Sequence, residues 1–216
     1  ETLRDVTGLN LARAENPVYA TQNIDAIVET SGLVRTQAAN LTKMADDVRT
    51  YALLGELTLP FYQPGSSLMP GKVNPVICEA AMQAGLRVMA DDRLIADAAS
   101  RGRLQINEFL PLVAHAFLGA LRTLRDAAAM FAETIARTQA DEAACARHVD
   151  ESPLALTVLV PQMGYATVQA LVAEYTARGA GSLRAFLTEK YGAETARRLL
   201  APERFTKLGY TDSDRI

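Results

Sequence analysis

Residues 20–52 read ATQNIDAIVETSGLVRTQAANLTKMADDVRTYA, and this stretch decides the fold class. One set of its positions advances alternately by four and by three residues, and all but one are apolar: Ala20, Ile24, Ile27, Ser31, Val34, Ala38, Leu41, Ala45, Val48 and Ala52. An apolar seam of this length is typical of a long helix packed nearly parallel to other helices. We therefore predict one helix of a bundle here.

Two further long helices are predicted downstream. Asn74 and Pro75 have the residue types of an N-cap and a first-turn proline, and they open a helix that runs through Val88. Another helix begins near Pro111 and carries apolar residues along one side as far as Phe131. Helices of about 40 Å are long for one small globule, so upstream helices, neighbouring subunits or both are expected to cover their apolar faces.

Composition agrees with an all-α fold. Aromatic residues make up 6% of the 216 residues and Trp is absent, which favours helices over strands. After about residue 144, frequent prolines and glycines divide the chain into short helices. We predict the carboxy-terminal part of a central helical-bundle domain over residues 1–144 and a small helical carboxy-terminal domain over residues 145–216.

Charge and cysteine usage exclude several classes of function. The 22 basic and 25 acidic residues give a net charge of -3, so no general attraction to nucleic acid or to acidic membranes is expected. The sequence has no bilayer-spanning run and no export signal, and a cytoplasmic location is expected. Cys78 and Cys145 lack metal-site spacing, and we expect neither a metal nor a cofactor.

A loop rich in small residues separates the first two long helices and reads GSSLMPGKVNP over residues 65–75. It holds two adjacent hydroxyl groups, a lysine, and an asparagine at the start of a helix. Backbone N–H groups at a helix N-terminus and the Lys72 ammonium group both favour an anion. A carboxylate or a phosphate fits this arrangement, although each residue taken singly has an ordinary explanation as a turn, a cap or a solvated charge.

This loop resembles, almost letter for letter, the signature GSSxMPxKxNP of the fumarase/aspartase superfamily. Other segments are similar to the same family over essentially the whole chain: VTGL at 6–9, MADDVR at 44–49, GRLQINEFLP at 102–111 and VPQMGY at 160–165. The resemblance implies a β-elimination on a succinyl-type substrate, a small dicarboxylate. A proton leaves the carbon next to one carboxylate, and an amine or a hydroxyl then departs to give fumarate.

The same resemblance implies roles for five residues. Ser66 is the catalytic base, and its alkoxide must be favoured by nearby N–H groups and positive charge. Lys72 and Asn74 match positions that hold the substrate carboxylate, and Ser67 is an additional donor. Glu79 matches the acid that pairs with a histidine and orients its imidazole.

The sequence departs from the family's pattern in two places. The upstream segments that supply the partner histidine and further substrate contacts have no counterpart, and His115 and His148 stand in other contexts, where structural roles are favoured. The sequence thus resembles the carboxy-terminal half of such an enzyme and is expected to be inactive alone. Residues 49–56, RTYALLGE, lack a Ser-Gly-Pro-Arg stretch of many relatives, which indicates either a shortened connection or a segment missing from the printed sequence.

Assembly and leaving group follow from the resemblance as expectations. Family members build each active site from three subunits of a tetramer, so a homotetramer with composite sites is expected. Residues 20–23 and 102–111 favour an aspartate ammonia-lyase, whereas residues 77–80 are similar to fumarases. We favour the aspartate ammonia-lyase, with fumarate hydratase as the alternative. A non-catalytic helical scaffold is the rival from another class, and the intact serine, lysine and asparagine of the loop argue against it.

Overall fold

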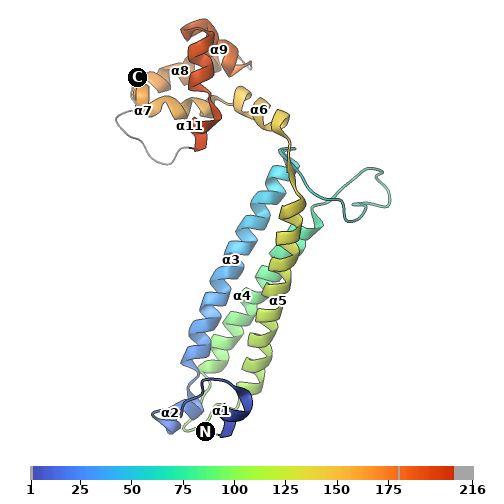
Figure 1. The fold of residues 1–216 in the computed structure, drawn as a ribbon, viewed down its shortest axis with the longest axis vertical. Coiled ribbons are helices and arrows are strands. Elements are labelled where there is room, and N and C mark those ends of the chain that lie inside the picture. The colour runs from blue at the N-terminus through green and yellow to red at the C-terminus, as the bar shows by residue number, and fades with distance from the viewer. Residues whose placement is uncertain (1, 180, 207–216) are drawn as a thin grey trace. The chain divides into compact units, whose positions relative to one another are not determined.

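The computed structural model of the chain describes residues 2–179 and 181–206. It is helical with only two short strands in these ranges, which confirms the predicted all-α class (Figure 1). The chain divides into two compact units, Glu1–Gln139 and Ala140–Ile216. The boundary predicted after residue 144 lies inside a helix, α6, of the second unit.

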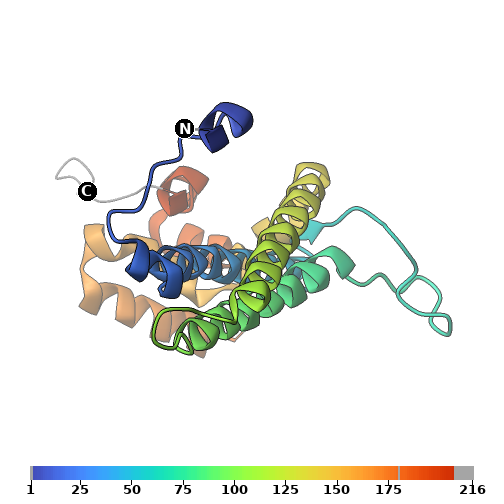
Figure 2. The ribbon, with the colours of Figure 1, turned by 90° about the horizontal axis from the view of Figure 1, so that it is seen from below.

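Three long helices build the first unit and lie side by side (Figures 1 and 2). The middle one, α4, packs against both of the others. The helices of this unit are α1 (Thr2–Thr7), α2 (Pro17–Gln22), α3 (Asp25–Leu53), α4 (Val76–Ala99) and α5 (Leu110–Arg137). The bundle predicted from the apolar seam is therefore present.

The centre of the seam is buried as predicted, and its start is not. Ser31, Ala38, Leu41 and Ala45 are buried on α3. Ala20, in contrast, is exposed and belongs to the separate helix α2. The chain is extended at Asn23, the C-cap of α2, and this extended residue interrupts the helix before α3 begins.

A buried carboxylate links α3 to α4. Asp92 is 7% exposed, and its Oδ1 accepts a hydrogen bond of 2.7 Å from the Ser31 hydroxyl. Its Oδ2 accepts one of 2.9 Å from the Arg35 guanidinium. Because a buried carboxylate without partners is costly, these bonds fix which residues of the two helices face each other.

The connection after α3 is short and has its backbone hydrogen bonds satisfied. The Gly55 N–H donates to the Ala52 carbonyl and the Glu56 N–H to the Tyr51 carbonyl, which is the Schellman pattern of a helix C-terminus. Strand β1 (Leu57–Thr58) follows at once and pairs with β2 (Gln139–Ala140). The connection thus leads from the end of α3 directly into β1.

The second unit consists of short helices around its own core. They are α6 (Glu142–Glu151), the 3₁₀ helix η1 (Pro153–Leu159), α7 (Val160–Met163), α8 (Tyr165–Ala177), α9 (Leu183–Tyr191), α10 (Ala193–Leu199) and α11 (Pro202–Thr206). Buried leucines fill this core, and the rings of Tyr175 and Phe186 meet edge to face at 5.5 Å. The ranges that the structure describes contain no helix long and apolar enough to cross a bilayer.

Candidate active site

Residues 65–75, the signature loop, form a hairpin that leads into α4. The Gly65 N–H donates to the Lys72 carbonyl over 2.7 Å, and the Asn74 side-chain amide donates to the Gly65 carbonyl over 3.2 Å. A Cβ at position 65 would lie 2.8 Å from that Lys72 carbonyl oxygen. The two ends of the hairpin meet this closely because residue 65 has no side chain.

Ser66 lies inside the hairpin with its hydroxyl oxygen facing two backbone donors. This oxygen accepts hydrogen bonds of 3.1 Å from the N–H groups of Leu68 and Met69. N–H donors aimed at one oxygen favour its negatively charged form, because they gain most when charge develops there. The main chain of the loop itself therefore supplies two N–H donors to the Ser66 oxygen.

Asn74 differs from its predicted local role. The sequence assigns it as the N-cap of the second long helix, but the N-cap residue of α4 is Pro75 and no side chain caps this end. The Asn74 amide instead reaches back across the hairpin to Gly65. Asn74 therefore joins the loop containing Ser66 to the start of α4.

The remaining predicted residues differ in exposure, and two of them, Ser67 and Lys72, belong to the hairpin itself. Ser67 and Lys72 are exposed, and the described part of the chain gives neither an ion pair nor a side-chain hydrogen bond to them. Glu79 is half-buried in the first turn of α4. The structure thus ties Asn74 to Gly65, the residue before Ser66, and leaves Ser67 and Lys72 exposed.

Neither the histidines nor Cys78 is a residue of the signature loop. His115 is exposed on α5, and His148 belongs to α6 of the second unit. Cys78 follows the loop on α4 but is fully buried, and this burial raises the pKa of its thiol. A thiol held protonated in an apolar core is a poor nucleophile.

Sequence reasoning missed the two backbone donors of Ser66. The chemistry of a serine base predicts N–H groups around Ser66, but every residue except proline carries a main-chain N–H, so the residue types do not identify the donors. The only sequence signal is the spacing, since a serine oxygen commonly accepts from N–H groups two and three residues later in a turn. Leu68 and Met69 stand at those two positions.

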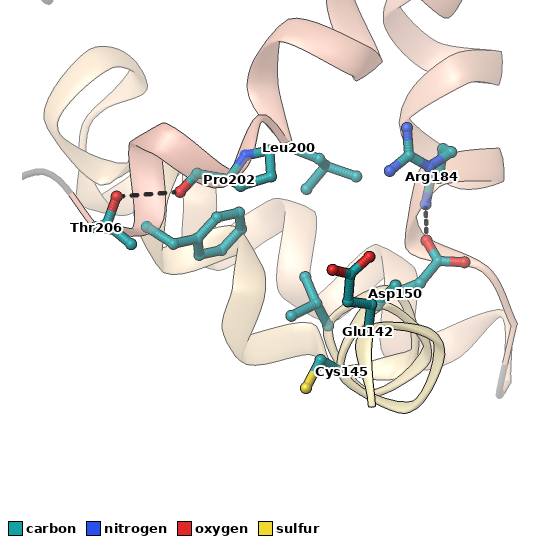
Figure 3. A pocket seen from close by; sticks show the side chains of 10 residues that line it. Glu142, Cys145, Asp150, Arg184, Leu200, Pro202 and Thr206 are labelled. Atoms are coloured by element: carbon teal, nitrogen blue, oxygen red, sulfur yellow. Dashed lines mark hydrogen bonds between the residues drawn. The ribbon is translucent and has the colours of Figure 1, made fainter. Parts of the chain in front are cut away.

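A separate pocket of about 510 Å³ lies within the second unit (Figure 3). Its lining is mostly apolar, with Glu142, Asp150 and Arg184 as charged members. Asp150 accepts a hydrogen bond of 2.7 Å from the Arg184 backbone N–H. None of the predicted site residues lines this pocket, so it is distinct from the hairpin.

Comparison with known proteins places the chain in a family. A family model described as "Lyase" matches residues 1–90. Fumarate hydratase class II from Bacillus cereus is 38% identical over 171 residues, which cover 76% of this chain and 37% of that protein. The structure of fumarate lyase:delta crystallin from Brucella melitensis matches with a TM-score of 0.84 and 34% identity, covering 95% of this chain and 46% of that one. The chain belongs to the fumarase/aspartase superfamily.

This superfamily member spans less than half the length of the relatives it matches. The class II fumarase of Schistosoma mansoni, for example, matches with a TM-score of 0.78 and 30% identity over 93% of this chain and 46% of that chain. The names of the relatives give no support to the aspartate ammonia-lyase favoured from the sequence. They favour the alternative, fumarate hydratase.

Proposed function

We propose that the chain supplies part of the active site of a fumarate hydratase, a lyase that interconverts malate with fumarate and water. The observation that carries the proposal is the Ser66 oxygen, which accepts two backbone N–H groups at 3.1 Å within the hairpin. The fumarate hydratase names of the relatives support the choice of a hydroxyl leaving group.

In the proposed reaction the Ser66 alkoxide removes a proton from the malate carbon next to one carboxylate. The electron pair left on that carbon delocalises into the carboxylate, which becomes a dianion. Expulsion of the hydroxyl from the adjacent carbon then forms the double bond of fumarate. The hydroxyl leaves as water by taking a proton from a general acid that another segment or subunit would supply, while the proton removed from malate stays on Ser66. In the reverse direction, water adds to fumarate and the Ser66 hydroxyl returns its proton.

The negative charge of the dianion must be stabilised by the other residues of the site. Lys72 brings a full positive charge and is exposed within the hairpin, which suits it to pair with a substrate carboxylate. Asn74 keeps one amide hydrogen beyond the bond it makes to Gly65, and Ser67 offers a free hydroxyl donor. Glu79 is assigned to orient a histidine that another segment or subunit would supply.

An assembly of several subunits would complete this site. Large apolar side chains are exposed on all three long helices, among them Leu33, Leu86 and Leu118 at 64%, 62% and 48%. Exposed apolar faces of this kind are usually covered by other helices. We propose a homotetramer with composite sites that act on a small dicarboxylate, and a cytoplasmic location stays a prediction.

The test is turnover by the complete gene product. Formation of fumarate, followed by its ultraviolet absorbance, should proceed from L-malate and not from L-aspartate. Ser66→Ala should abolish turnover, whereas Ser100→Ala, at an exposed serine at the end of α4, should not. Turnover of aspartate alone would refute the proposed hydratase activity and show an ammonia-lyase instead. A folded oligomer without activity on either substrate would favour the scaffold.

A further inference from the structure

A tyrosine just before the signature loop is tied to α5. The Tyr62 hydroxyl lies 2.9 Å from the Thr134 hydroxyl, although the two residues are 72 positions apart in the chain. Thr134 is only 1% exposed. The Arg137 guanidinium carbon lies 5.5 Å from the centre of the Tyr62 ring, which adds a cation–π contact on the same side of α5.

The direction of this hydrogen bond follows from the other partner of Thr134. The Thr134 hydroxyl already donates its single proton to the Met130 carbonyl over 3.0 Å. It therefore acts as acceptor toward Tyr62, and the tyrosine hydroxyl is the donor. Removal of the tyrosine hydroxyl would leave a buried acceptor on α5 with one partner fewer.

The segment between this contact and the catalytic serine is short. Three residues, Gln63, Pro64 and Gly65, separate Tyr62 from Ser66. Phe61, Gln63 and Pro64 are exposed, and Tyr62 itself is 40% exposed. The stem of the hairpin therefore gains little from burial, and its hydrogen bond to Thr134 is the main contact that holds it. Proline restricts its own φ and the conformation of the residue before it. A fixed Tyr62 therefore restricts where Ser66 lies.

We propose that Tyr62 and Thr134 form an anchor that positions the signature loop for proton transfer by Ser66. Tyr62 holds the incoming end of the hairpin on α5, while Asn74 holds the outgoing end at the start of α4. Both are positioning roles, because neither Tyr62 nor Thr134 is assigned a contact with substrate. The inference rests on the proposed function and adds to it the residues that orient the base.

The experiment compares loop protection with kinetics in the complete gene product. Tyr62→Phe and Thr134→Val each remove one hydroxyl of the pair. Each should speed hydrogen exchange at the amides of Leu68 and Met69, which donate to Ser66, by about three- to tenfold. We expect kcat on malate to fall by a similar factor, with KM changed less than about twofold, because the base acts in the transition state. The double variant should be little worse than either single variant, since both remove the same bond.

Two controls keep the test specific. Thr134→Ser keeps a hydroxyl acceptor and should retain wild-type exchange and kcat. Tyr165→Phe removes a hydroxyl from a 70% exposed tyrosine and should change neither. Exchange at the α5 amides should stay slow in every variant, which reports that the bundle is folded.

Several results would overturn the anchor. Wild-type exchange at Leu68 and Met69 in Tyr62→Phe would show that Tyr62 does not hold the loop. Faster exchange with unchanged kcat would show that the contact does not serve catalysis. If Thr134→Ser speeds hydrogen exchange of the loop as much as Thr134→Val does, the Thr134 hydroxyl is not the group that holds Tyr62. Absence of turnover in the wild-type protein would overturn the proposed function instead, and the exchange rates would still decide whether Tyr62 holds the loop.

Discussion

Replacing Gly65 with alanine tests whether closure of the hairpin controls activity. An alanine Cβ would lie 2.8 Å from the Lys72 carbonyl oxygen and 3.0 Å from the Asn74 side-chain oxygen. The first of these belongs to the backbone, so it cannot move by a change of rotamer. Gly65 does not have a positive φ, which means that alanine is acceptable to the backbone and only the closure is disturbed.

The size of the effect follows from the bonds at risk. Relief of the contact separates Gly65 from Lys72 and Asn74 and so weakens two hydrogen bonds, of 2.7 and 3.2 Å. At about 0.5 to 1.5 kcal/mol each, their loss disfavours the closed hairpin by about 1 to 3 kcal/mol. If only the closed hairpin is active, kcat/KM on malate should fall by about 5- to 140-fold.

The assay is steady-state turnover beside thermal unfolding. Gly65→Ala should lower kcat/KM while leaving Tm within about 2 °C, because the hairpin is exposed and the cores of both units are untouched. Gly119→Ala is the matched control, since a Cβ at this α5 position would meet nothing within 4 Å. It should keep activity and match or raise Tm, as expected when alanine replaces a helical glycine. Wild-type kcat/KM in Gly65→Ala would refute the link between closure and catalysis.

Two further predictions concern the bundle. Asp92→Ala should lower the free energy of unfolding by about 1 to 3 kcal/mol, because it leaves the buried Ser31 hydroxyl without its acceptor. The control Asp97→Ala removes an exposed ion pair with Arg93 and should lower it by less than about 1 kcal/mol. Urea unfolding measures both, and equal losses in the two variants would contradict the prediction. Cys78 should resist alkylation by iodoacetamide at pH 8 in the folded protein, because burial raises the pKa of its thiol and its thiolate fraction falls. Peptide mass spectrometry measures this, and rapid labelling of Cys78 before unfolding would disprove its burial.

The long helices could be predicted because their cause is local. Apolar residues at helical spacing are visible in the sequence, and the buried positions Ala38, Leu41 and Ala45 are those of the predicted seam. The break before α3 was not predictable from the same pattern. Ala20 and Ile24 are four residues apart whether or not the helix continues between them, so periodicity cannot register an extended Asn23.

The site shows the same division between local and distant causes. The residue types of the hairpin identify the family, and the need for donors around Ser66 follows from the chemistry of a serine base. The choice of partner for Asn74 does not follow, since an asparagine before a helix serves equally well as a cap or as a cross-loop donor. The contact of Tyr62 with Thr134 joins residues 72 positions apart in the chain, which no local pattern records.

The two donors to Ser66 are main-chain groups, while the side chains of the same residues point to solvent. Leu68 is 88% exposed and Met69 is 51% exposed. Substitution there alters the surface that the loop presents and leaves both N–H groups where they are. Leu68, a variable position of the signature GSSxMPxKxNP, can therefore change between family members while its backbone donor to Ser66 is kept.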